Sequence, residues 1–308
     1  MKTTMKNFFS PGAEFRGAPF WAWNAKLNRD ELIRQIHIFK EMGLGGFFMH
    51  SRVGLDTPYL GKDWFDCVKA CVAEAKKLGL LAYLYDEDRW PSGAAGGIVT
   101  KDDAFKSRWC EAQFFSSAAE AEKKVRGEPL AWYSAVVSGS FEKKNLTVKS
   151  PRRLKSPEDF RQEKGRKLLC FAIRLMDGHN WFNGGTYLDM LNPDAVRKFI
   201  KTTHEAYAAR IGDEFGKTVP AIFSDEPMFF WTPLSSVIVP WTDRLPDEFL
   251  AAYGVDVYGF LPEIFFPSVR KKSLRRMQFL NLATGMFCRA FAKTIGMWCI
   301  KATGRKGW

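Results

Sequence analysis

Three successive carboxylates interrupt an apolar segment and are the residues best suited to chemistry in this chain. Asp86, Glu87 and Asp88 directly follow the apolar residues 80–85. Like charges repel, so a strand alone does not favour three acids there, and alternation predicts that Asp86 and Asp88 point away from Glu87. Such a cluster can transfer protons, hold hydroxyl groups or bind a hard cation such as Ca²⁺. The alternative is a solvated strand end with Arg89 as its counter-ion.

Polar residues follow three other apolar segments in the same way. Asp225 and Glu226 end one segment, Asn24 ends another, and His50 with Arg52 ends a third. In parallel α/β proteins the carboxyl ends of the strands carry the active site. We therefore expect these side chains to meet the three acids along one edge of a sheet.

The elements that position these residues alternate between apolar strands and amphipathic helices. We expect helices over residues 28–43 and 64–78, because apolar residues recur there at helical spacing and each segment ends at a glycine. Parallel strands are expected over residues 19–24, 45–52, 80–85 and 219–223. This alternation of strands and helices, with polar residues at the strand ends, predicts an α/β fold of the (β/α)₈ TIM-barrel type. A doubly wound sheet is the alternative, but no glycine-rich phosphate loop follows the first strand.

Regularity breaks after Gly97, where strand-like segments are separated by charged turns. Residues 109–115, 130–137 and 168–175 indicate an antiparallel β insertion. Helices are expected from the Asn192 N-cap to about residue 215, over 246–253 and over 273–299. Only about the first half of a barrel is then present. The expected division is a first barrel part (15–103), a β-rich insertion (104–188), a barrel continuation (189–300) and a tail (301–308).

Composition limits the class of protein. The 308 residues are 46% hydrophobic and 26% charged, which is typical of a globular chain. The net charge of +12 is concentrated in residues 269–308, which have ten Lys or Arg and no acid, without any recognisable nucleic-acid-binding motif. The six cysteines form no CxxC pair. Residues 1–10 have lysines but no apolar region, so we expect no secretory signal, and no apolar run reaches membrane-spanning length. We expect a reduced, cytoplasmic protein that binds neither nucleic acid nor membrane.

Several long motifs resemble one family. PFWAWN, GGFFMHSRVGLDTPYLG, YLYDEDRWPSGAAGG, YLDMLNPDAVRKFI and IFSDEP are similar to the barrel domain of bacterial α-L-rhamnosidase-like glycoside hydrolases, above all family 106. The resemblance covers about residues 15–298 and implies a (β/α)₈ catalytic domain acting on a glycosidic bond of an oligo- or polysaccharide. The family continues through further strands and usually into β-sandwich domains, so the resemblance also implies a chain truncated after the fourth strand.

The resemblance assigns a general acid. In the family the fourth strand ends in that acid, and Glu226 occupies the position here. An apolar strand and the neighbouring Asp225 would keep Glu226 protonated; the alternative is that both acids pair with basic groups of a loop. The second carboxylate is open between Asp86, Glu87, Asp88 and a residue of a later strand. The expected catalytic set is Glu226, Asp225 and Glu87.

A second group of residues is expected to bind the substrate. Tryptophans can stack on a sugar face, although core packing is the alternative for each of them. The expected binding residues are Trp23, Asn24, His50, Arg52, Asp86, Asp88, Arg89 and Trp90. No metal site or cofactor is indicated beyond the Ca²⁺ considered for the three acids. Carbohydrate is the expected partner, with self-association through exposed sheet edges. The alternative function is an inactive fragment that at most binds carbohydrate.

Overall fold

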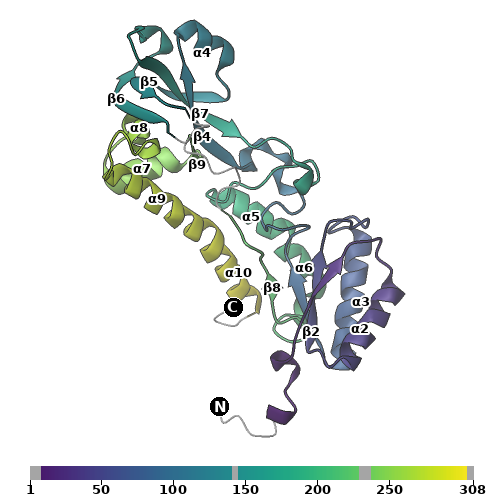
Figure 1. Cartoon of the computed structure of the whole chain (residues 1–308). Helices are drawn as coiled ribbons and strands as arrows, with labels where there is room; N and C mark the ends of the chain where they lie inside the picture. Colours follow the sequence, from purple (N-terminus) through teal and green to yellow (C-terminus); the bar gives the residue numbers. More distant parts are fainter. Residues whose placement is uncertain (1–7, 141–144, 229–236, 304–308) are drawn as a thin grey trace.

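The computed structural model describes residues 8–140, 145–228 and 237–303, and arranges their strands in two sheets (Figure 1). The first is a parallel sheet with strand order β1-β2-β3-β8. Its strands are β1 (Phe20–Trp23), β2 (Gly46–Ser51), β3 (Leu81–Tyr85) and β8 (Ile222–Phe223). All neighbouring pairs run parallel, which confirms the four strands expected from sequence and their common direction. The fold is mixed α/β; among the described residues these four strands do not close into an eight-stranded barrel.

Helices cover one face of the parallel sheet. They are α2 (Arg29–Glu41), α3 (Lys62–Leu78) and α6 (His204–Ile211), and they share a core with the sheet. Helix α2 starts where the Asn28 side chain accepts a hydrogen bond of 3.0 Å from the Glu31 N–H, as the sequence predicts. Because side chains alternate along each strand, the opposite face presents the rings of Phe20, Phe48, Tyr83, Tyr85 and Phe223.

The second sheet is antiparallel, with strand order β6-β5-β7-β4-β9. Its strands are β4 (Arg108–Phe115), β5 (Glu128–Ser138), β6 (Thr147–Leu154), β7 (Arg166–Leu175) and β9 (Ile238–Trp241). The three strands expected in the insertion are therefore confirmed as β4, β5 and β7. Sequence reasoning missed the edge strand β6, whose alternation is hidden by Lys and Arg side chains, and the short β9, which joins β4 from a distant part of the chain.

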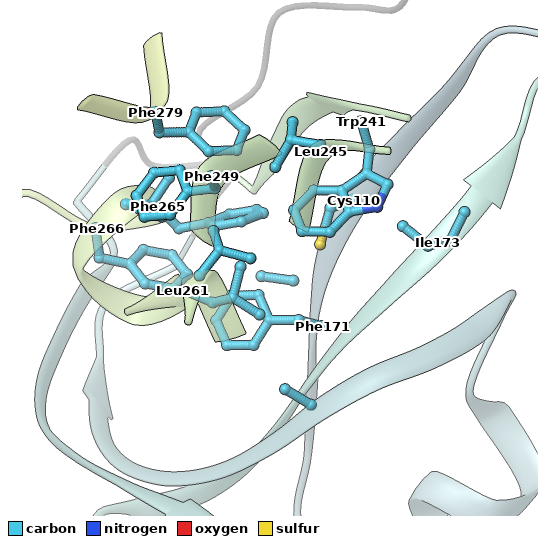
Figure 2. Packing of buried hydrophobic residues seen from close by; sticks show 14 of the residues in the cluster. Cys110, Phe171, Ile173, Trp241, Leu245, Phe249, Leu261, Phe265, Phe266 and Phe279 are labelled. Atoms are coloured by element: carbon cyan, nitrogen blue, oxygen red, sulfur yellow. The ribbon is translucent and has the colours of Figure 1, made fainter. Parts of the chain in front are cut away.

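Helices from the last third of the chain complete the core of this antiparallel sheet (Figure 2). These helices are α7 (Leu245–Tyr253), α8 (Leu261–Phe265) and α9 (Leu274–Phe287). Phe171 of β7 packs against Phe265, and Trp241 of β9 packs against Phe279. On the other face α4 (Ala118–Lys124) joins a smaller cluster. Strand β9 and residues 245–287 pack with the antiparallel sheet, within the range 189–300 that is expected from sequence to continue the barrel.

Two helices expected as continuous are interrupted. The helix that begins at Asn192 consists of α5 (Pro193–Thr202) and α6, with a break at Thr203. The last helix consists of α9, a π-helical segment (Cys288–Lys293) and α10 (Thr294–Thr303). Residues 304–308 of the expected tail lie outside the described residues. Along the described part of the chain, no helix is both long and apolar enough to cross a bilayer.

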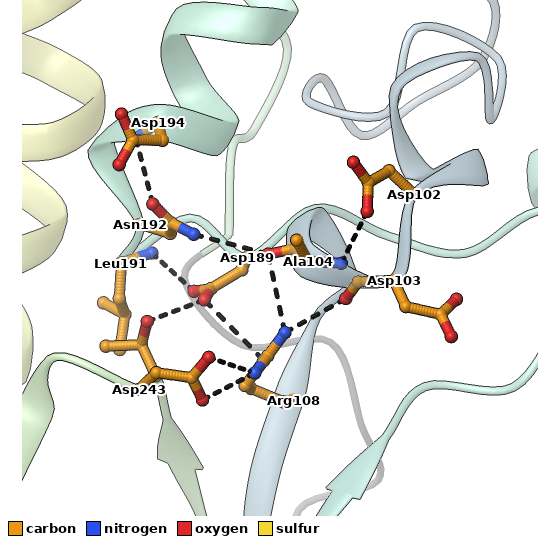
Figure 3. A network of polar contacts seen from close by, with 10 residues as sticks. Asp102, Asp103, Ala104, Arg108, Asp189, Leu191, Asn192, Asp194 and Asp243 are labelled. Atoms are coloured by element: carbon orange, nitrogen blue, oxygen red, sulfur yellow. Dashed lines mark hydrogen bonds and ion pairs between the residues drawn. The ribbon is translucent and has the colours of Figure 1, made fainter.

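A polar network ties the start of β4 to the segments entering α5 and α7 (Figure 3). The Arg108 guanidinium donates two hydrogen bonds of 2.6 Å to Asp243, and its Nε lies 4.0 Å from Asp189 Oδ2. Asp189 also accepts a hydrogen bond of 2.7 Å from the Thr242 hydroxyl. Burial raises the pKa of Asp189 to about 7. The network fixes where the antiparallel sheet meets the rest of the molecule.

Candidate active site

The loop after β3 meets the segment after β8, and Ser92 joins them. The Ser92 N–H donates to the Asp225 carbonyl oxygen at 2.9 Å, and the Asp225 N–H donates to Ser92 Oγ at 2.8 Å. The Ser92 hydroxyl donates in turn to Asp86 Oδ1 at 2.5 Å. Tyr187 adds a second link, because its hydroxyl donates to the Ser92 carbonyl and accepts from the Met228 N–H. The two strand ends that sequence analysis singled out therefore form one connected structure.

Asp86 faces inward rather than toward solvent. Its side chain is completely buried, and burial raises its pKa to about 7. Its Oδ2 lies 3.6 Å from His204 Nε2 of α6, and burial lowers the pKa of His204 to about 3. Because this pair is buried, it does not contact a ligand. Asp86 is expected from sequence to bind substrate, but its contacts support the strand ends from the protein interior.

Glu87 shapes the loop that follows it. Its carboxylate accepts hydrogen bonds from the backbone N–H groups of Asp88, Gly93, Ala95 and Gly96, the first three at 2.8–2.9 Å. Burial raises its pKa to about 8, and these backbone donors oppose that shift. Both oxygens are thus engaged inside the protein. These contacts favour a positioning role for Glu87 over the catalytic role expected from sequence.

Asp88 points to a third set of partners. It accepts hydrogen bonds from the Ser51 hydroxyl at 2.6 Å and from Asn183 Nδ2 at 2.5 Å, and Arg89 Nε lies 3.7 Å away. Asp88, Arg89 and Asn183 also line an open cavity of about 220 Å³. The three successive acids therefore diverge. Across residues 8–140, 145–228 and 237–303, no group of three or more His, Cys, Asp or Glu side chains is arranged to hold a metal ion, so the Ca²⁺ site considered from sequence gains no support.

The Asp225 side chain is held by a tyrosine on the sheet face opposite to the helices. The Tyr85 hydroxyl donates to Asp225 Oδ2 at 2.7 Å, and the Tyr85 ring lies 3.9 Å from the His50 ring, centroid to centroid. Burial, with a smaller contribution from Arg52, lowers the pKa of His50 to about 4, so its imidazole is neutral at pH 7. His50 Nε2 is buried without a hydrogen-bond partner in the described residues. His50, Tyr85 and Asp225 thus come together at the ends of three strands.

Glu226 is the most accessible of the five acids. Its side chain is exposed, and its Oε2 accepts a hydrogen bond of 2.8 Å from Trp90 Nε1. Its backbone has φ of +41°, a strained value for a residue with a Cβ and one that occurs preferentially at functional sites. The sequence predicts apolar surroundings for Glu226, and this prediction is wrong because the side chain is exposed. Trp90 itself is held by Trp181, whose indole N–H donates to the Trp90 carbonyl.

Three residues of the expected binding set form no hydrogen bond or ion pair with this cluster within the described ranges. Trp23 is only 2% exposed and packs edge-to-face on Trp64 in the helix-covered core, so it cannot stack on a ligand. Asn24 is exposed beyond the end of β1, and Arg52 is half-buried, with no hydrogen bond or ion pair from its guanidinium to any described residue. For Trp23 the alternation of β1 decides the outcome, because it places Trp21 and Trp23 on the same buried side.

Sequence reasoning missed five residues of this region. Tyr85 and Ser92 lie inside the motif that it singled out, and a polar tip at a strand end was the available signal. Trp181 and Asn183 come from a turn-rich segment without periodicity, where no pattern marks them, and Tyr187 opens the motif YLDMLNPDAVRKFI, which by itself gives the residue no role. The missed residues are Tyr85, Ser92, Trp181, Asn183 and Tyr187.

Comparison with known proteins gives a likeness of fold. The chain matches no family model and no curated protein sequence. Among solved structures it is similar to a rhamnosidase from Novosphingobium sp. PP1Y, with a TM-score of 0.59 and 12% sequence identity. The likeness covers 97% of this chain and 46% of that rhamnosidase, so the chain spans less than half of its length. At this identity the likeness supports a shared fold.

Proposed function

We propose that this chain is a glycoside hydrolase domain of rhamnosidase-like type, acting on a glycosidic bond of an oligo- or polysaccharide. The observation that carries the proposal is the placement of Asp225 and Glu226 at the carboxyl end of β8, beside Trp90 and Trp181. Carboxyl groups break glycosidic bonds, and aromatic rings stack on sugars. The similarity of fold to a rhamnosidase agrees with this chemistry.

Glu226 is the proposed general acid. The Trp90 indole N–H is a donor only, so it bonds to an oxygen of Glu226 that carries no proton. A proton on Glu226 therefore resides on Oε1, from which it passes to the glycosidic oxygen as the bond to the anomeric carbon breaks. The hydroxyl of a water molecule then joins the anomeric carbon, and the remaining proton of that water is released to solvent, from which Glu226 is protonated again.

Asp225 is the proposed second carboxylate. Tyr85 holds its Oδ2, and its backbone is fixed to Ser92 on both sides. A carboxylate fixed in this way can stabilise positive charge that develops on the sugar ring in the transition state. Glu87 serves this arrangement indirectly, by shaping the loop that carries Trp90 and Ser92.

Hydrolysis of 4-nitrophenyl and of methyl α-L-rhamnopyranoside tests the proposal. We expect turnover of the nitrophenyl glycoside by the full chain. For Glu226→Gln we expect a loss of at least about a hundredfold in kcat on the methyl glycoside, whose leaving alkoxide must be protonated, and a smaller loss on the nitrophenyl glycoside, whose leaving group needs no proton. Glu205→Gln is the matched control, because Glu205 is also exposed but lies on α6. Equal activity of Glu226→Gln and wild type contradicts the acid assignment. Sugar binding without turnover instead supports the alternative of a carbohydrate-binding domain.

A further inference from the structure

A second cavity lies beside the candidate active site. It has a volume of about 490 Å³ and is formed by two glycine-rich segments, residues 96–106 and 178–186. The segments touch directly: a Cβ on Gly97 would lie 2.5 Å from the Phe182 carbonyl oxygen, and one on Gly185 would lie 2.9 Å from Gly97 Cα. The Thr100 hydroxyl also donates to the Thr186 carbonyl at 2.7 Å. The cavity wall is therefore a built, closely packed structure.

The charge lining this cavity has one sign. Lys101 and Lys106 belong to its lining, whereas no Asp or Glu does. Lys106 forms an ion pair with Asp103, but the Lys101 ammonium has no ion pair or hydrogen bond with any described residue. A cavity with this lining attracts an anionic group.

A continuous set of contacts leads from the candidate acid to this cavity. Glu226 bonds to Trp90, and the Trp90 carbonyl accepts from Trp181, which directly precedes the lining residue Phe182. Asn183 lines both this cavity and the smaller one at Asp88. Glu226 and the cavity wall are thus connected through Trp90 and Trp181.

We propose that this cavity is a subsite for a sugar unit that carries a carboxylate, which Lys101 binds. The inference rests on the proposed function and deepens it: the substrate is an acidic rather than a neutral saccharide. The selectivity comes from the unpaired ammonium of Lys101 in a cavity without acids.

Direct binding of small probes tests the subsite without any need for hydrolysis. Titration calorimetry would compare methyl β-D-glucuronide, methyl β-D-glucoside and inorganic sulfate on the full chain. We expect the glucuronide to bind at least about tenfold more tightly than the glucoside, and Lys101→Gln to remove most of that difference. Lys123→Gln, at an exposed lysine of α4, should bind as wild type does.

Lys101→Gln should keep the wild-type urea midpoint of unfolding, because Lys101 is exposed, and this shows that the variant is folded. Equal affinity for glucuronide and glucoside, or an unchanged affinity in Lys101→Gln, overturns the subsite. Sulfate binding as tight as glucuronide binding overturns its sugar component. Failure of rhamnoside hydrolysis, in contrast, affects the proposed function alone, because these affinities are measured independently.

Discussion

The Tyr85 hydroxyl donates a 2.7 Å hydrogen bond to Asp225 Oδ2, although the two residues are 140 positions apart in the sequence. Tyr85 ends β3 and Asp225 follows β8, and these strands pair in parallel with Tyr85 opposite Phe223. The parallel register brings the two side chains to the same edge of the sheet. A phenol that holds one carboxylate oxygen leaves the other free to face a ligand.

Tyr85→Phe should lower kcat/KM for the aryl rhamnoside by about tenfold, because Asp225 loses the donor that orients it. The effect should fall mainly on kcat, since the substitution leaves the binding surface unchanged. Steady-state kinetics measures this split. Tyr83→Phe is the matched control, since Tyr83 lies on the same strand and the same face but does not contact Asp225. An equal loss in both variants would indicate a general effect on the sheet.

Glu87→Gln should destabilise the fold by about 3 kcal/mol at pH 9, where Glu87, with a pKa of about 8, is ionised. Four backbone N–H groups donate to the carboxylate, and an amide presents its own donors to some of them, which leaves buried donors unpaired. The measurement is the urea midpoint by circular dichroism. Glu122→Gln is the control, because Glu122 is exposed on α4. A Glu87→Gln variant as stable as the control would show that these contacts contribute little.

The pH dependence of stability should contain a contribution from Asp86. Its folded-state pKa of about 7 lies above the ordinary value of 3.8, so the folded state binds the proton more tightly. The contribution is fully present below pH 3.8 and is lost as the pH rises to 7. At about 1.4 kcal/mol per pKa unit, the loss is at most about 4 kcal/mol.

Asp86→Asn removes this titration, so its free energy of unfolding should fall less than that of wild type between pH 4 and pH 7. The buried His204 contributes with the opposite sign, because its lowered pKa favours the folded state at higher pH. Comparison of the two proteins isolates Asp86, and Asp213→Asn, at an exposed position, should retain the wild-type slope. Parallel curves for wild type and Asp86→Asn would refute the shift.

The strand ends were predictable because hydrophobic patterning determines them. Apolar runs that end in acids placed Asp86 and Asp225 at one edge of a parallel sheet, and the structure confirms the four strands and their direction. The direction of each acid was not predictable. Backbone N–H groups of the following loop donate hydrogen bonds to Glu87. His204, which lies close to Asp86, comes from a helix in another part of the chain. Both partners depend on tertiary packing, which local periodicity does not encode.

The role of a tryptophan within a strand depends on which face of the sheet its side chain occupies. A residue is either core or binding surface according to which face of the sheet it occupies, and a one-residue shift exchanges the two. Trp23 occupies the helix-covered face, whereas Trp90 lies beyond the strand and reaches Glu226. Strands β6 and β9 escaped prediction for a related reason: one is charged, and the other is short and paired with a distant segment.

Self-association should occur through the aromatic face of the parallel sheet. Sequence analysis expected it at exposed sheet edges, and the structure adds a surface next to them: Phe20 on the edge strand β1 is 50% exposed and contacts Phe48 and Phe223. Parallel sheets are normally covered on both faces, because both carry apolar side chains. A second copy of the chain can cover this face and thereby bury its exposed aromatic side chains.

Sedimentation equilibrium should therefore show a dimer that dissociates on dilution. Phe20→Thr should weaken it by at least about tenfold, since burying a phenylalanine contributes about 1.5–3 kcal/mol. Phe15→Thr, at an exposed phenylalanine outside this face, should leave it unchanged. A monomer at all concentrations, or equal weakening by both substitutions, would assign the aromatic face no part in association.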